Sequence, residues 1–96
     1  MNSKRRKELY AVVKKLNAWY MVNHQEADAI LDMVKNDLDL ILYDEESYID
    51  NIPENLQNGY RYQMAEEACD NIECAIDAIN DGEIDDAINY IYNATV

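Results

Sequence analysis

The sequence predicts an all-α protein, with residues 1–96 forming a single helical domain. Its 96 residues include only two glycines and one proline, and a chain rich in loops or β-turns would hold more of both. Apolar residues recur every three or four positions, which is the spacing of an amphipathic helix. At this length a single core gives only modest stability, so self-association is a common supplement.

A long N-terminal helix is expected from about Ser3, a suitable N-cap, to about Tyr43. Its apolar stripe comprises Leu9, Val13, Leu16, Tyr20, Ala27, Ile30, Val34, Leu38 and Ile41. The stripe keeps one angular phase from end to end, which favours a continuous helix of roughly 60 Å at 1.5 Å per residue. Asn23 occupies the one missing apolar place, where a buried Asn could fix register. The alternative is a local break at Asn23-His24 that leaves two shorter helices.

Residues 50–60 are expected to connect this helix to the rest of the chain. The helix could continue as far as Ile49, but Pro53 disfavours helical geometry at the residue before it. Asn58-Gly59 is a turn signal. The chain is therefore expected to reverse direction here.

Two shorter helices are expected after the connection, the first from about Tyr60 to Asn80. Its apolar side comprises Ala65, Ala68, Cys69, Ile72, Ala75, Ile76 and Ile79. This pattern does not continue in phase past Asp81-Gly82, which indicates a break or a sharp kink. A third helix then runs to about Ala94.

The expected architecture is an antiparallel hairpin, because the two shorter helices together match the long one in length. Two narrow stripes would leave several apolar side chains uncovered, namely Val12, Trp19, Leu31, Leu42 and Tyr92. Burying one such side chain is worth about 1.5 to 3 kcal/mol. A homodimer packed as a helical bundle is therefore expected. A compact monomer is the alternative if the long helix breaks at Asn23.

Charge is distributed unevenly along this acidic chain, whose formal net charge is −12. Residues 1–15 hold six basic residues and one acidic residue, whereas the remaining 81 hold two basic and nineteen acidic residues. An acidic body is repelled by nucleic acid and by anionic membranes, and attracted to basic proteins, over a Debye length of about 8 Å. We expect no direct nucleic-acid binding and no membrane binding, and a partner with a basic surface.

No group of residues predicts catalysis, a metal site or a cofactor. His24 is the only histidine, and it lacks the spacing to a second ligand that a transition-metal site uses. A calcium loop centred on Gly82 would place isoleucine at two liganding positions. Cys69 and Cys74 point about 140° apart on one helix and cannot bridge within it, which is typical of reduced cytosolic thiols. Near the N-terminus the longest apolar run is the short AWYMV, so neither secretion nor a membrane span is expected.

The carboxylates form two rows, each on one side of its helix. The N-terminal row is Asp28, Asp32 and Asp39, and the second-helix row is Glu66, Asp70, Glu73 and Asp77. Like charges at these spacings cost a few tenths of a kcal/mol per pair, and their separation of roughly 5 to 6 Å resembles the spacing of phosphates along a nucleic-acid strand. One interpretation is a rigid polyanion that occupies a basic nucleic-acid groove on another protein. The other is a solvated face that keeps a small protein soluble.

The stretch DNIPENLQNGYRYQMAEEACDNIECAIDAI, residues 50–79, resembles a group of small acidic helical proteins encoded by bacteriophages and prophages. In that group an RRK-x-L helix leads to a D-N-[IM]-P-E-N-L-Q connection and then to a helix containing A-x-x-x-x-D-N-[IL]-x-x-A-I-D. RRKEL at residues 5–9 fits the first motif, and the middle of the long helix lies outside the resemblance. The resemblance implies a phage context and a character similar to that of anti-CRISPR and anti-restriction inhibitors. It implies no site residues.

Together these observations lead us to expect a non-enzymatic, phage-encoded, anti-CRISPR-like inhibitor that acts in the host bacterial cytoplasm. It would bind a basic surface of a host defence complex, such as a CRISPR effector or another nuclease, as a nucleic-acid mimic. The expected contact residues are Asp28, Asp32, Asp39, Glu66, Asp70, Glu73 and Asp77. The alternatives are a structural dimerisation or adaptor protein with a solvent-facing acidic surface, and an acidic antitoxin with a basic toxin partner.

Overall fold

The computed structural model describes residues 1–22 and 24–95, with the backbone alone at His24. Within these residues the secondary structure is helical, with turns between the helices and no strands, so the all-α prediction is confirmed. The elements are α1 (Ser3–Trp19), α2 (His24–Asp50), the 3-10 turn η1 (Glu54–Leu56), α3 (Tyr60–Asn80) and α4 (Ile84–Ala94).

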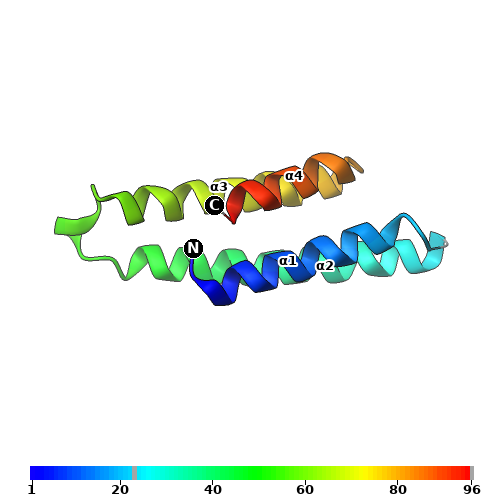
Figure 1. Ribbon diagram of the computed structural model, residues 1–96, viewed down its shortest axis with the longest axis horizontal. Coiled ribbons are helices and arrows are strands. Elements are labelled where there is room, and N and C mark those ends of the chain that lie inside the picture. Colours follow the sequence, from blue (N-terminus) through cyan, green and yellow to red (C-terminus); the bar gives the residue numbers. More distant parts are fainter. Residues whose placement is uncertain (23, 96) are drawn as a thin grey trace.

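The expected long helix from Ser3 to Tyr43 is wrong. Helix α1 ends at Trp19, where the N–H of Met21 donates to the carbonyl of Ala18 at 3.0 Å, and α2 begins at His24. The chain reverses there, so α1 lies antiparallel against α2 (Figure 1). Each helix turns its own apolar stripe to the same core, and a stripe of unchanged phase fits this hairpin as well as it fits one straight helix. Asn23, which was expected to occupy a place in the apolar stripe, lies outside the described residues, as does the side chain of His24.

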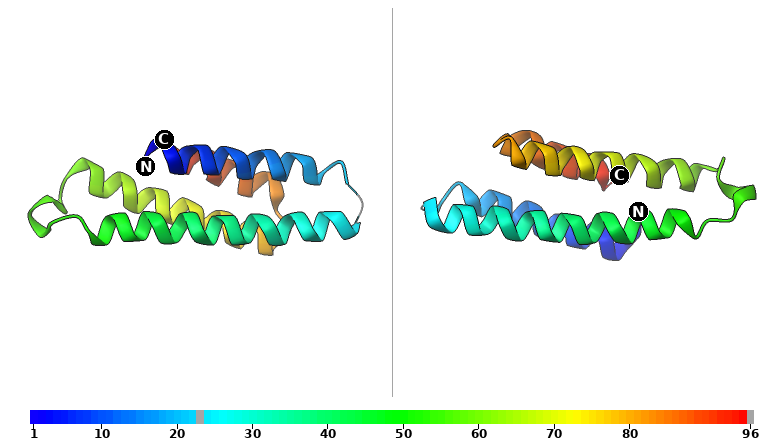
Figure 2. Two further views of the ribbon diagram at one scale, coloured as in Figure 1. Left: turned by 90° about the horizontal axis from the view of Figure 1, so that it is seen from below. Right: turned by 180° about the vertical axis from the view of Figure 1, so that it is seen from behind.

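The helices form two antiparallel pairs stacked on each other. Helices α1 and α2 form one layer, α3 and α4 the other, and contacts join α1 to α2, α2 to α3, α3 to α4 and α4 to α1 (Figure 1). The molecule measures 51 × 19 × 18 Å. Helices α2 and α3 extend beyond the start of α1 and the end of α4, and η1 connects them at that end (Figure 2).

The core lies along the axis between the four helices. Its most completely buried apolar side chains come from all four helices and are Leu9, Leu16, Val34, Leu38, Ile41, Ile72 and Ile91. Val12 is also buried, and Trp19, Leu31 and Leu42 pack against this core, whereas Tyr92 remains exposed. A single chain thus covers most of the residues on which the expectation of a dimer rested, because the break after α1 adds a fourth helix to the bundle.

The predicted break between α3 and α4 is confirmed at Asp81-Gly82. Gly82 has φ +78°, the left-handed conformation that glycine adopts without steric cost. Its N–H donates to the carbonyl of Ile79 at 3.1 Å, and the N–H of Glu83 donates to that of Ala78 at 2.8 Å. This pair of bonds is the Schellman motif that ends many helices. It lets α4 return along α3.

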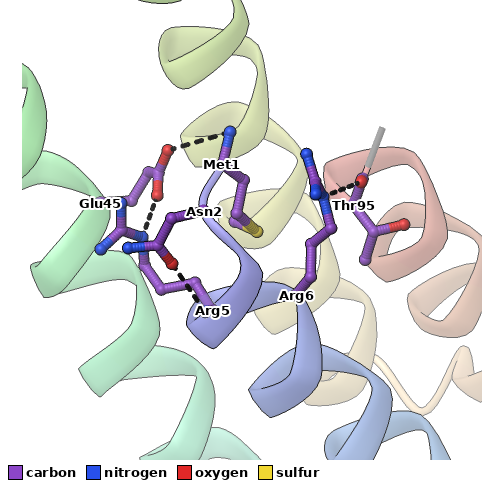
Figure 3. Close-up of polar contacts among 6 residues, drawn as sticks. All are labelled: Met1, Asn2, Arg5, Arg6, Glu45 and Thr95. Carbon is purple, nitrogen blue, oxygen red and sulfur yellow. Dashed lines mark hydrogen bonds and ion pairs between the residues drawn. The ribbon is translucent and has the colours of Figure 1, made fainter.

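A buried ion pair fixes the start of α1 against α2 (Figure 3). Glu45 of α2 is completely buried, and its Oε2 accepts a hydrogen bond from Nε of Arg5. The amino group of Met1 lies 3.9 Å from Glu45 Oε1. Arg6 reaches the other layer, where its Nε donates to the carbonyl of Thr95 at 3.0 Å. The N-cap is Asn2 rather than Ser3, because the Asn2 side chain accepts from the Arg5 backbone N–H at 2.9 Å.

Candidate protein-binding surface

All seven carboxylates that the sequence singled out are exposed on the helices where they were expected. Asp28, Asp32 and Asp39 project from α2, and Glu66, Asp70, Glu73 and Asp77 project from α3. None faces the core, because each row lies on a flank of its helix, outside the buried apolar stripe. The side chains are therefore free to meet another molecule.

The acidic row of α2 is longer than the sequence analysis expected. Glu46 and Asp50 are exposed and lie within about 40° of Asp28, Asp32 and Asp39 around the helix at ~100° per residue. They were missed because the helix was expected to end near Tyr43. The spacing itself, seven residues from Asp39 to Glu46 and four more to Asp50, was the signal available in the sequence.

The two rows converge at a shallow groove between α2 and α3, which we name the acidic groove. It encloses about 300 Å³ and is lined by Glu46, Ile49, Asp50, Glu66, Cys69, Asp70 and Glu73. Figure 2 (right) shows these two helices side by side on the side away from α1 and α4. Five of the seven lining residues are acidic and none is basic, so the groove concentrates negative charge.

The groove therefore unites only part of the expected set. Glu66, Asp70 and Glu73 line it together with the two carboxylates that were missed. Asp28, Asp32, Asp39 and Asp77 do not line it and lie further along the same two helices. They extend the acidic surface towards the opposite end of the bundle. We call this whole surface, groove and extension, the acidic face.

The thiol of Cys69, which lines the groove, has a raised pKa. Burial, and to a lesser extent the neighbouring carboxylates of Glu45, Glu46, Glu73 and Asp70, raise the pKa of Cys69 to about 12. Desolvation and negative neighbours both disfavour a thiolate. Cys69 is thus neutral at physiological pH, and the negative charge of the groove comes from carboxylates alone.

Few basic side chains neutralise the acidic face. Lys35 Nζ lies 3.7 Å from Asp32 Oδ1, an exposed contact within one helix, and this is the only ion pair of the seven carboxylates among the described residues. Exposed pairs of this kind contribute less than about 1 kcal/mol. Glu66 accepts a hydrogen bond from the Tyr62 hydroxyl, and this bond is the main reason why the pKa of Tyr62 is raised.

The acidic face offers carboxylate oxygens as acceptors for guanidinium or ammonium groups, which form the stronger class of hydrogen bond. Across the part of the chain that the structure describes, no three His, Cys, Asp or Glu side chains converge closely enough to hold a metal ion. None of the described helices has the length and apolar character of a membrane span.

No protein-family model, curated protein or solved structure matches this chain.

Proposed function

We propose that this chain is a non-enzymatic inhibitor whose acidic face occupies a basic, nucleic-acid-binding surface of another protein. The observation that carries the proposal is the acidic groove, where carboxylates from α2 and α3 surround one depression that no basic residue lines. The carboxylates substitute for phosphates, and the packed bundle holds them in fixed positions. By analogy with the phage-encoded proteins that residues 50–79 resemble, we propose a host defence complex, such as a CRISPR effector, in the bacterial cytoplasm as the target.

The cost of this arrangement favours binding over solubility as its purpose. Like charges one helical turn apart cost a few tenths of a kcal/mol per pair, and the groove adds further repulsion between two helices. Scattered acidic residues would keep the protein soluble without that cost. A basic partner reverses the sign of these interactions, because each carboxylate then gains a counter-charge. Repulsion in the free protein is thus relieved on binding.

The test neutralises the α3 row while preserving the shape of every side chain. In the α3-row variant the four substitutions are Glu66→Gln, Asp70→Asn, Glu73→Gln and Asp77→Asn. Wild-type chain immobilised on a resin should retain nucleic-acid-binding proteins from bacterial lysate, and an excess of duplex DNA or of RNA should release them. The α3-row variant should retain much less of the same proteins, because four of the charges that attract them are gone.

A control variant carries the same change in net charge away from the acidic groove. Its substitutions are Glu54→Gln, Glu67→Gln, Asp81→Asn and Glu83→Gln, all at exposed positions. This control should retain the same proteins as wild type. Retention by the α3-row variant equal to that of wild type, or retained proteins that nucleic acid does not release, would reject the proposal. An acidic antitoxin would instead retain a single basic protein encoded beside it.

A second candidate function is dimerisation or adaptor binding through apolar side chains. It is favoured by three large apolar side chains of α2 that are exposed to solvent on the side of the helix facing away from the core, namely Met33, Leu40 and Tyr43. This candidate predicts binding that survives neutralisation of the α3 row and is lost when Leu40 becomes charged. The apolar candidate centres on the outer side of α2, next to the acidic row of that helix, whereas the inhibitor proposal centres on the acidic groove and the α3 row.

A further inference from the structure

Helix α2 carries a second apolar stripe, which we name the outer stripe, on the side facing away from the core. Its members are Ala29, Met33, Asn36, Leu40 and Tyr43, separated by steps of four, three, four and three residues. Met33 is 53%, Leu40 65% and Tyr43 69% exposed. Steps of this kind form the seam of a coiled coil. The stripe lies about 140° around α2 from the buried one at ~100° per residue, so no other helix of the chain covers it.

The two flanks of the outer stripe carry opposite charge. On one side runs the acidic row of α2, with Asp32, Asp39 and Glu46. On the other side lies α1, whose exposed surface carries Lys4, Lys7 and Lys14. Figure 2 (left) shows α1 and α2 side by side on this face.

A small residue of α1, Ala11, lies beside Leu40 on this face. A depression of about 220 Å³ is lined by Glu8, Ala11, Lys15, Asp37, Leu40 and Ile41. Lys15 and Asp37 within it are already paired at 2.5 Å. Besides this pair the depression holds the carboxylate of Glu8, and the positive charge of the α1 flank comes from Lys4, Lys7 and Lys14 beyond it.

We propose that a second copy of this chain docks on the α1–α2 face, with the two α2 helices parallel and their outer stripes in contact. A two-fold axis along the seam exchanges left and right, so the lysine flank of each copy meets the acidic flank of the other. An antiparallel pairing would place lysine against lysine and carboxylate against carboxylate. A basic helix from another protein would meet the lysines of α1 on one flank. Charge complementarity thus selects a second copy in one orientation.

The charges also match in position along the seam. Arg5 pairs with Glu45 and Lys15 with Asp37, so these two contacts set the antiparallel register of α1 on α2. Lys14 accordingly lies near the level of Asp39, and Lys7 lies between the levels of Asp39 and Glu46. A two-fold axis parallel to the helices preserves these levels. The lysines of one copy therefore come opposite the carboxylates of the other.

Asn36 lies at the centre of the outer stripe. In a parallel seam each residue faces the same residue of the second copy, so the two Asn36 side chains meet and can hydrogen-bond to each other. A single polar residue in an apolar seam specifies register at some cost in stability. The seam from Ala29 to Tyr43 is only about 21 Å long at 1.5 Å per residue. An interface this short is expected to be weak and reversible.

This dimer gives the second candidate function a defined interface and does not depend on the inhibitor proposal. It uses the outer stripe and the acidic row of α2. The α3 row remains exposed to a basic partner. Failure of one proposal therefore leaves the other standing.

Disulfide trapping tests the orientation. Met33→Cys and Leu40→Cys are made separately in a Cys74→Ser background, because Cys74 is exposed whereas Cys69 is buried. In the parallel dimer each new cysteine faces the same cysteine of the second chain. Their Cα atoms then lie within the reach of a disulfide, about 7 Å. Both variants should form disulfide dimers under mild oxidation. The background chain should form no disulfide-linked dimer. An antiparallel seam would trap only the mixture of the two variants, and that result would overturn the proposal.

A charge swap tests the complementarity. Sedimentation equilibrium at up to roughly 1 mM chain, chosen because the interface is small, measures the dissociation constant. Lys7→Glu with Lys14→Glu should weaken the dimer by about tenfold or more, because several exposed ion pairs become repulsive. Adding Asp39→Lys and Glu46→Lys to that variant should restore the affinity of the dimer, because each flank then again meets a flank of opposite charge. A chain that stays monomeric at all concentrations, or a dimer indifferent to the swap, would overturn the proposal. Circular dichroism confirms that each variant folds.

Discussion

At the residue scale, Glu45 and Arg5 form the contact on which the most stability should depend. Glu45 is completely buried, and the Arg5 side chain keeps only 11% of its exposure. A buried charge left without its partner costs roughly 3 to 5 kcal/mol. Glu45→Gln should therefore lower the free energy of unfolding in urea by about 3 kcal/mol.

The matched control for this prediction is the Lys15–Asp37 pair between the same two helices. Its side chains are 38% and 35% exposed, so Asp37→Asn should cost less than about 1 kcal/mol. Equal losses in the two variants would show that burial does not set the strength of these pairs. Arg5→Met combined with Glu45→Leu should recover much of the loss, because neither charge is then buried alone.

The two thiols should differ sharply in reactivity. Cys74 is exposed and should react with a disulfide reagent within seconds at pH 8. Cys69 is buried, its pKa is raised to about 12, and it should react only when the chain unfolds. Equal rates for the two thiols in the native protein would contradict the packing of α3 against α2.

The same shift makes stability depend on pH at the alkaline end. The pKa of Cys69 is raised from 9.0 to about 12 on folding, so the unfolded chain loses the thiol proton first. Its contribution to stability is present below pH 9 and is lost as the pH rises towards 12. The free energy of unfolding should fall more steeply over this range in wild type than in Cys69→Ala. Parallel curves for the two proteins would contradict this assignment.

At the element scale, the turn between α3 and α4 should depend on Gly82. A side chain at its φ of +78° is strained, although no atom lies within 4 Å of the added Cβ. Gly82→Ala should cost about 1 to 2 kcal/mol, measured by urea unfolding. Gly82→Asn should cost less, because Asn tolerates the left-handed conformation better than Ala. If both substitutions were neutral, the Schellman turn would not be the feature that ends α3.

Local sequence signals predicted the second half of the fold well. Tyr60, Asn80 and Ala94 are helix ends that the structure confirms. Pro53 and Gly59 precede the first of these ends, and Gly82 with a loss of apolar phase follows the second. The first half was predicted less well. No glycine or proline interrupts residues 1–50, and the turn after Trp19 is set by packing of α1 on α2. Tertiary contacts of this kind leave no mark on helical periodicity.

At the scale of the whole molecule, the sequence predicted the exposure of the seven carboxylates but not how they gather. Exposure follows from helical phase within one helix. Convergence at the acidic groove depends on how α2 is aligned against α3, and on the true length of α2, which adds Glu46 and Asp50. The burial of Glu45 likewise required the position of α1. Sites shared between helices are the features that a single sequence specifies least.

The charge distribution of the whole molecule gives a prediction of its own. A complex held by the acidic face should weaken steeply as salt increases, because screening acts on exposed charges over about 8 Å at physiological ionic strength. The affinity of a captured partner for the wild-type chain should therefore fall between low and high salt. The α3-row variant should show a smaller slope as well as weaker binding. An affinity that does not change with salt would indicate an apolar interface.

Competition with nucleic acid tests the central claim most directly. Fluorescence anisotropy follows a labelled nucleic acid bound to the captured partner while the chain is added. The account predicts that wild type and the control variant displace the nucleic acid, and that the α3-row variant needs at least about tenfold more protein, since each lost charged hydrogen bond is worth roughly 1.5 to 3 kcal/mol. Nucleic acid that stays bound while wild type also binds, or equal displacement by the α3-row variant, would contradict it.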